Sequence, residues 1–177
     1  MPEPIQKKVC MIGSYGVGKT SLVRRFVESI FDERYQTTIG VKIDRKRVVV
    51  DETELNLILW DLAGEDELAQ IRDSHVRGAS GFILVADGCR AATLERAVSL
   101  RQLLGKPVAG IPFVLAINKA DRAADWEIPA SSLEELARTG WRLLSTSAKT
   151  GDGVESLFET LARSMLTSMQ DRAVDGI

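Results

Sequence analysis

The sequence predicts a three-layer α/β domain, with a mostly parallel sheet of about six strands and about five helices. Two observations predict this class. Apolar runs rich in β-branched residues alternate along the chain with helical patterns, which is typical of parallel strands joined by crossover helices. One pair of runs is joined by a segment too short for a crossover, which predicts one antiparallel edge strand.

The first strand is expected at Lys8–Ile12, and a glycine-rich loop follows it directly. The loop Gly13–Thr20 reads Gly-Ser-Tyr-Gly-Val-Gly-Lys-Thr and fits the pattern GxxxxGK[ST] in full. A helix is expected next, because apolar residues recur there at helical spacing. These residues are Leu22, Val23, Phe26, Val27 and Ile30.

The order of strand, glycine loop and helix is the context that a phosphate-binding loop requires. Glycines let backbone N–H groups approach phosphate oxygens, and the positive end of the helix dipole lies beside them. Lys19 can reach the β- and γ-phosphates, and the Thr20 hydroxyl can bind Mg²⁺. The alternative is a glycine turn that matches the pattern by accident. We expect nucleotide binding.

The next two strands are predicted as a hairpin. The runs Val41–Asp51 and Leu55–Asp61 are separated only by Glu52–Glu54, so they must be antiparallel. The segment Lys42–Arg47 is strongly charged. We interpret it as an edge strand protected from mispairing rather than as a binding patch.

Three further strands alternate with helical patterns in the second half of the chain. The strands are expected at Phe82–Ala86, Phe113–Ile117 and, more weakly, Trp141–Leu144. Ser131 and Glu134 could form a capping box at the start of the second helix. Apolar residues mark the three helices: Leu94, Val98 and Leu104; Leu133, Leu136 and Ala137; and Val154, Leu157, Phe158, Leu161 and Met165.

Three more short motifs follow strands, and ligands bind at the carboxyl ends of parallel strands. Asp61–Gly64 reads DxxG, which offers a carboxylate for Mg²⁺ and a backbone N–H for the γ-phosphate. Asn118–Asp121 reads NKxD, where a carboxylate can accept two hydrogen bonds from guanine, a donor pair that adenine lacks. Ser147–Lys149 reads SAK, whose backbone N–H groups can contact the guanine carbonyl.

Composition and charge limit the functional classes. The 177 residues suit one domain, and the net charge of −2 gives no indication of a nucleic-acid partner. Cys10 and Cys89 lack metal-ligand spacing, so we expect reduced thiols in a cytoplasmic protein. No apolar run is long enough to span a membrane, and no terminal cysteine for a lipid anchor is present. We expect a GTP-binding domain at residues 7–169, with tails at 1–6 and 170–177.

With these motifs, the chain resembles the Ras superfamily of small GTPases, most closely its Rab branch. The resemblance covers about residues 7–168, including Thr38–Val41, Trp60–Asp61 and Arg77–Ala79. It implies that Phe31 stacks on the guanine edge and that Tyr35 closes over the phosphates. It also implies that Thr38 binds Mg²⁺ only when the γ-phosphate is present.

The motifs and the resemblance together define the expected site. Lys19, Thr38, Gly64 and Glu65 are the expected catalytic residues, and Thr20, Thr38 and Asp61 the expected Mg²⁺ ligands. Effectors, exchange factors and activators would bind residues 32–43 and 64–78. The residues expected to contact GTP or GDP are Gly13, Tyr15, Gly16, Val17, Gly18, Lys19, Thr20, Ser21, Phe31, Tyr35, Thr38, Asp61, Gly64, Asn118, Lys119, Asp121, Ser147, Ala148 and Lys149.

The chain departs from the family at several positions. Glu65 replaces the glutamine that orients the attacking water, so we expect slow hydrolysis of GTP. Tyr15 stands where an activator's arginine approaches; it would crowd that arginine, contact the phosphate through its hydroxyl, or point to solvent. Ile43 and His75 replace aromatic residues of a surface triad that retains only Trp60. We expect a GTP-hydrolysing switch; the alternative is a GTP-binding scaffold with negligible hydrolysis.

Overall fold

The computed structural model describes residues 3–34, 38–62 and 73–175, and its sheet confirms the expected fold class. Six strands lie in the order β2-β3-β1-β4-β5-β6, and all neighbouring pairs are parallel except β2 and β3. The strands are β1 (Ile5–Gly13), β2 (Val41–Val50), β3 (Thr53–Leu62), β4 (Gly81–Asp87), β5 (Phe113–Asn118) and β6 (Leu143–Ser145). The helices are α1 (Lys19–Glu28), α2 (Asp73–Val76), α3 (Ala92–Leu104), α4 (Ala130–Arg138) and α5 (Val154–Asp175), with 3₁₀ turns η2 (Lys106–Val108) and η3 (Ala120–Asp125).

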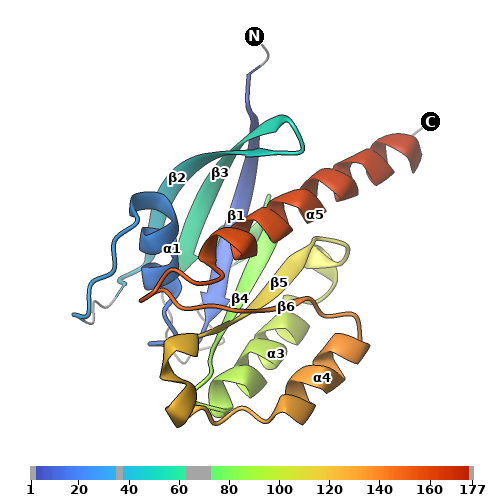
Figure 1. The fold of residues 1–177 in the computed structure, drawn as a ribbon. Helices are drawn as coiled ribbons and strands as arrows, with labels where there is room; N and C mark the ends of the chain where they lie inside the picture. The colour runs from blue at the N-terminus through green and yellow to red at the C-terminus, as the bar shows by residue number, and fades with distance from the viewer. Residues whose placement is uncertain (1–2, 35–37, 63–72, 176–177) are drawn as a thin grey trace.

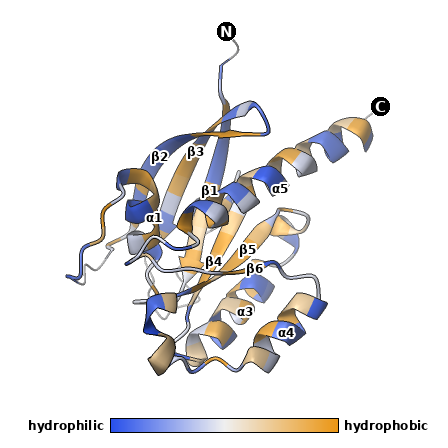
Figure 2. Cartoon of the chain, viewed as in Figure 1, coloured by the Kyte–Doolittle hydropathy of each residue, from blue (hydrophilic) through white to orange (hydrophobic). Residues whose placement is uncertain are grey.

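The helices cover both faces of the sheet and form three layers. Helices α1 and α5 pack on one face, and α3 and α4 on the other (Figure 1). The central strand β4 is buried along its whole length, which explains its continuous apolar sequence. The apolar colouring of β4 and β5 contrasts with the polar outer surfaces of the helices (Figure 2). No helix in the described ranges combines the length and apolar character that crossing a membrane would require.

The hairpin and the charged edge strand are confirmed, but the hairpin turn is tighter than expected. β3 begins at Thr53, so only Asp51 and Glu52 connect the two strands. Both residues have positive φ angles, 47° and 64°. Backbone of this kind matches the twist of the flanking strands and is tolerated by glycine, asparagine and aspartate, so it suits Asp51 but is unfavourable for Glu52. Arg163 of α5 pairs with the Asp51 carboxylate at 3.2 Å and holds the turn against the helix.

Two local predictions about helix ends are wrong. Helix α1 ends at Glu28, because Ser29 adopts a left-handed conformation with φ 57°. Ile30 therefore lies beyond the helix and is 48% exposed. At α4, Pro129 is the N-cap and no side chain caps the helix, so Ser131 lies inside the first turn and the expected capping box does not form.

The apolar stripe predicted on the last helix is confirmed. Val154, Leu157, Phe158, Leu161 and Met165 are all buried on α5. The first strand and the last helix extend into the two segments that were expected as tails. β1 already begins at residue 5, and α5 continues beyond residue 169 to residue 175.

Candidate nucleotide-binding site

A cleft of about 590 Å³ opens at the carboxyl ends of β1, β5 and β6. Its walls come from four separate segments, namely the glycine loop with the start of α1, the segment after α1, the loop after β5 and the loop after β6. Such a cleft is large enough for a mononucleotide-sized ligand. The lining residues are Tyr15, Gly16, Gly18, Lys19, Thr20, Ser21, Arg24, Ile30, Phe31, Asp32, Glu33, Arg34, Thr38, Asn118, Lys119, Asp121, Arg122, Ala148 and Lys149.

Glycine is required at two positions of the loop because neighbouring atoms lie very close to the backbone there, and at one of them also because of the φ angle. Gly18 has φ 103°, and a Cβ atom there would lie 2.3 Å from Asn118 Nδ2. A Cβ atom at Gly13 would lie 2.4 Å from the carbonyl oxygen of Val85 in β4. Both contacts are too short for any side chain, so the loop can follow this path only with glycine at these two positions.

Lys19 lies at the base of this loop with only 6% of its surface exposed. Its ammonium donates hydrogen bonds to the carbonyl oxygens of Gly13 at 2.9 Å and Ser14 at 3.1 Å. Burial lowers the pKa of Lys19 to about 8; the nearby Asp61 carboxylate opposes this change and Arg90 adds to it. No carboxylate of the described residues pairs directly with the ammonium, so its charge is available to an anionic ligand in the cleft.

Three oxygen-bearing side chains meet beside Lys19. Thr20 Oγ1 lies 2.6 Å from Thr38 Oγ1 and donates to Asp61 Oδ2 at 2.5 Å. Thr38 also donates to Asp61 Oδ2, at 3.4 Å. Asp61 is 1% exposed, and its Oδ1 atom is buried without a hydrogen-bond partner among the described residues.

This donor set fits a magnesium ion. Burial raises the pKa of the Asp61 carboxyl, while the hydrogen bond from Thr20 opposes that effect. An unsatisfied buried carboxylate oxygen beside two hydroxyl groups is costly unless a cation completes it. Mg²⁺ prefers such oxygen ligands and commonly uses only one or two carboxylates.

Asn118 joins three segments of the cleft beside the glycine loop. Its Nδ2 donates to the carbonyl oxygen of Val17 at 3.0 Å, which ties the loop after β5 to the glycine loop. Its Oδ1 accepts hydrogen bonds from Thr146 Oγ1 and from the backbone N–H of Ala148, each at 3.2 Å. Since Asn118 is 2% exposed, all of these bonds are shielded from water.

The structure brings Asp121 and the SAK motif together. Ser147 Oγ donates to Asp121 Oδ1 at 2.6 Å, so the serine orients the carboxylate. The other oxygen of that carboxylate makes no hydrogen bond to the described residues. Phe31, Ala148 and Lys149, which the sequence analysis expected to contact the base, also line the cleft.

Sequence reasoning missed a network around Asp87, which ends β4. Lys119 Nζ lies 2.7 Å from Asp87 Oδ2, and Arg90 Nε donates to the same oxygen at 3.0 Å. Burial acts to raise the pKa of Asp87, but hydrogen bonds from Lys119, Cys89 and Arg90 outweigh this effect and lower it. Arg90 Nη2 also donates to the carbonyl oxygen of Tyr15 at 2.8 Å. The network therefore links the base-binding loop to the glycine loop.

Arg25 of α1 was also missed. Its guanidinium donates to the carbonyl oxygens of Ala148, at 2.8 Å, and Lys149, which holds the loop after β6 against α1. Asp87 could have been found from its position at a strand end, the same signal that identified Asp61. No sequence pattern marks Arg25 or Arg90.

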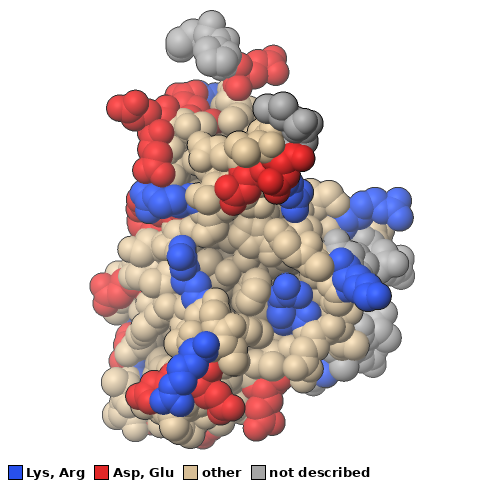
Figure 3. Space-filling model, turned by 90° about the vertical axis from the view of Figure 1, so that its right-hand side faces the viewer, with Lys and Arg blue, Asp and Glu red and all other residues tan. Residues whose placement is uncertain are grey.

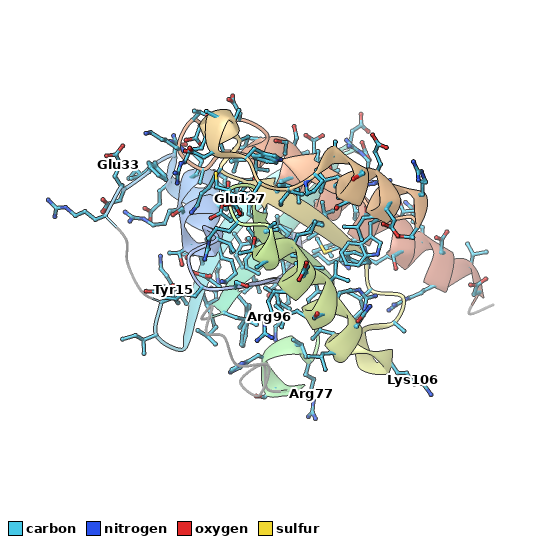
Figure 4. All side chains as sticks on the ribbon, turned by 90° about the horizontal axis from the view of Figure 1, so that it is seen from below. Tyr15, Glu33, Arg77, Arg96, Lys106 and Glu127 are labelled. Carbon is cyan, nitrogen blue, oxygen red and sulfur yellow. The ribbon has the colours of Figure 1, made fainter. Side chains whose placement is uncertain are left out.

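The remaining predicted residues divide into three groups. Tyr15 is 44% exposed and lies on the rim of the cleft, at the same end of the molecule as Glu33 (Figure 4). Predicted residues that support the cleft without lining it are Gly13, Val17, Asp61 and Ser147. Tyr35, Gly64 and Glu65 lie outside the described residues, as does most of the predicted partner-binding segment 64–78.

Comparison with known proteins agrees with this geometry. The Ras family model matches residues 8–167. The chain is 35% identical to the Ras-related protein Rab-13 of Canis lupus familiaris, over 90% of this chain and 79% of that protein. It is 34% identical to the GTP-binding protein ypt5 of Schizosaccharomyces pombe, over 91% and 78% of the two chains, and 33% identical to Rab-12 of Mus musculus, over 95% and 70%. The chain belongs to the Ras family, as a Rab-like GTP-binding switch protein with GTPase activity.

Proposed function

We propose that this protein binds GTP and GDP together with Mg²⁺ and hydrolyses GTP slowly, so that the bound nucleotide sets the position of the segment around Thr38. The convergence of the Thr38 and Thr20 hydroxyls on the buried Asp61 carboxylate carries this proposal. It links a residue beyond α1 to the glycine loop through a site suited to a cation that accompanies phosphates.

Each end of the cleft has a separate role. Lys19 and the backbone N–H groups of the glycine loop bind the phosphates and stabilise the charge that develops during transfer. Asp121 accepts hydrogen bonds from guanine, and Ser147 orients it for this purpose. Thr20, Thr38 and Asp61 would hold Mg²⁺, which when bound offsets negative charge on the phosphate oxygens.

Loss of the γ-phosphate would release Thr38 and relax the neighbouring segment. Residues 32–43 and 64–78 would then present different surfaces to effectors, exchange factors and activators in the two nucleotide states. A role in cytoplasmic signalling is part of this proposal. It is supported by family membership and by Cys10 and Cys89, which are free thiols.

The slow rate is proposed from Glu65, where a carboxylate replaces a glutamine amide. A carboxylate cannot donate a hydrogen bond to the phosphoryl oxygens, and it adds negative charge beside them. Glu65→Gln is expected to raise the single-turnover rate of GTP hydrolysis about tenfold, the effect of one charge-assisted hydrogen bond. An unchanged rate would show that Glu65 does not take part in the reaction.

Glu65 and Tyr15 also favour a second candidate, a GTP-binding scaffold with negligible turnover. Release of phosphate from the purified protein with Mg²⁺ and GTP distinguishes the two functions. Tyr15, exposed on the rim of the cleft, is proposed to obstruct the arginine of a Ras-type activator. The variant Tyr15→Ala should then respond more strongly to a Rab-type activator than the unmodified protein does, and equal acceleration of both would contradict this role.

A further inference from the structure

A second cavity, of about 250 Å³, lies at the opposite edge of the sheet from the nucleotide cleft. It is enclosed by the C-terminal half of α5 and by the segments that lead into β4 and β5. Met165, Met169 and Ile111 form apolar walls, while Lys7 and Arg172 bring two positive charges to it. Neither the nucleotide motifs nor the family resemblance accounts for these two charges.

Lys7 is the unusual residue of this cavity. Strand alternation places it on the same face of β1 as the buried Val9, beneath α5, and it is only 9% exposed. Among the described residues, its ammonium has no hydrogen-bond acceptor and no carboxylate partner. Lys8, on the other face of the strand, does have partners. It donates to the carbonyl oxygen of Arg77 at 2.9 Å and lies 3.7 Å from the centre of the Trp60 ring.

Arg172 makes the environment of Lys7 more positive. Burial lowers the pKa of Lys7, and the nearby charge of Arg172 lowers it further, with no opposing carboxylate effect. Within the described ranges, Arg172 makes no ion pair either, although Asp171 and Asp175 lie close to it in α5. Because Lys7 is largely buried, its charge beside a second cation is unfavourable unless an anion lies between them.

We propose that this cavity is a binding site for a phosphate group, either inorganic phosphate or a small phosphate monoester. The guanidinium of Arg172 can bind two phosphate oxygens at once, and the Lys7 ammonium supplies a compact second charge. The hydroxyl groups of Ser80 and Ser168 also line the cavity and can donate to the remaining oxygens. The apolar walls leave room for a small substituent on a monoester.

Basic and acidic side chains are mixed over the face that carries the C-terminal end of α5 (Figure 3). The charged residues that line the cavity itself are Lys7 and Arg172. The site is separate from the nucleotide cleft. It lies where the parallel strands begin, and β1 runs from Lys7 at this edge to Gly13 at the other.

The test uses protein loaded with GDP and Mg²⁺, so that the glycine loop is already occupied. Calorimetric titration with inorganic phosphate should show saturable binding at one site. Lys7→Met and Arg172→Gln should each weaken it at least tenfold. Lys106→Met is the matched control, because it removes a nearby exposed charge that points away from the molecule (Figure 4). A parallel titration with phenyl phosphate distinguishes the sources, since tighter binding than inorganic phosphate would assign the site to monoesters.

Thermal unfolding provides a second measurement. Lys7→Met should unfold at a higher temperature than the unmodified protein in the absence of phosphate, because it removes from a largely buried side chain a charge that has no partner among the described residues. Added phosphate should raise the unfolding temperature of the unmodified protein but not of this variant. If Lys7→Met does not fold, Arg172→Gln decides the question, because Arg172 is exposed at the end of its helix. Absent phosphate binding, or equal affinity in Arg172→Gln and the unmodified protein, would overturn the proposal.

Discussion

Nucleotide binding should take up a proton at mildly alkaline pH, because of Lys19. Burial in the folded protein lowers the pKa of this ammonium to about 8. Bound phosphates would place negative charge against Lys19 and return its pKa toward the ordinary value of 10.5. At a pH between these two pKa values, Lys19 is protonated in the nucleotide-bound protein but has lost its proton in the free protein. Affinity must therefore fall as the pH rises through 8.

The size of the effect follows from that pKa. About 90% of free protein carries the Lys19 proton at pH 7, but only about a quarter does so at pH 8.5. The affinity for GDP should therefore fall about fourfold between these pH values, or by about 1 kcal/mol. Binding should take up about 0.75 proton at pH 8.5 and about 0.1 at pH 7.

Calorimetry in buffers of different ionisation enthalpy measures this proton uptake directly. The chosen pH range lies above the titration of the GDP phosphate and below that of the guanine ring. Lys19→Arg is the control, since guanidinium stays protonated throughout and should remove the uptake even if it weakens binding. Equal uptake in the variant, or none in the unmodified protein, would refute the assignment of the proton to Lys19.

Three further outcomes test other parts of the structure. Arg90→Ala removes the 2.8 Å hydrogen bond to the Tyr15 carbonyl, so release of a fluorescent GDP should become about fivefold faster. Arg90→Lys should restore little of the slow release. An unchanged release rate in Arg90→Ala would exclude this link. Glu52→Gly relieves the positive φ of 64° in the hairpin turn and should raise the free energy of unfolding in urea by about 0.5 kcal/mol, whereas a decrease would show that the turn is not strained. Phe158→Ala removes a buried ring stacked 3.9 Å from Phe26 and should lower that free energy by about 3–5 kcal/mol; a loss below about 1 kcal/mol would contradict this packing.

Much of the fold was predictable because its signals are local. The glycines of the loop themselves indicate an unusual backbone conformation, and the position of the loop between a strand and a helix identifies the first crossover. The alternation of apolar runs gave the layers, and the short link between the two hairpin strands gave the antiparallel edge. The helix ends were less predictable. Ser29 and Pro129 changed them through single backbone conformations that apolar periodicity does not reveal.

The amino-acid order alone predicted the phosphate loop, the proposed Mg²⁺ ligands Thr20 and Asp61 and the proposed base-reading carboxylate, since each belongs to a short motif after a strand. Thr38 was expected only from the family resemblance. Only the folded chain revealed how these motifs are held together. Arg90 reaches Tyr15 across 75 positions, and Arg25 reaches Ala148 across 123. Lys7 and Arg172, near opposite ends of the chain, meet only because α5 packs back over β1. Such contacts depend on sheet order and helix packing, and no local pattern encodes them.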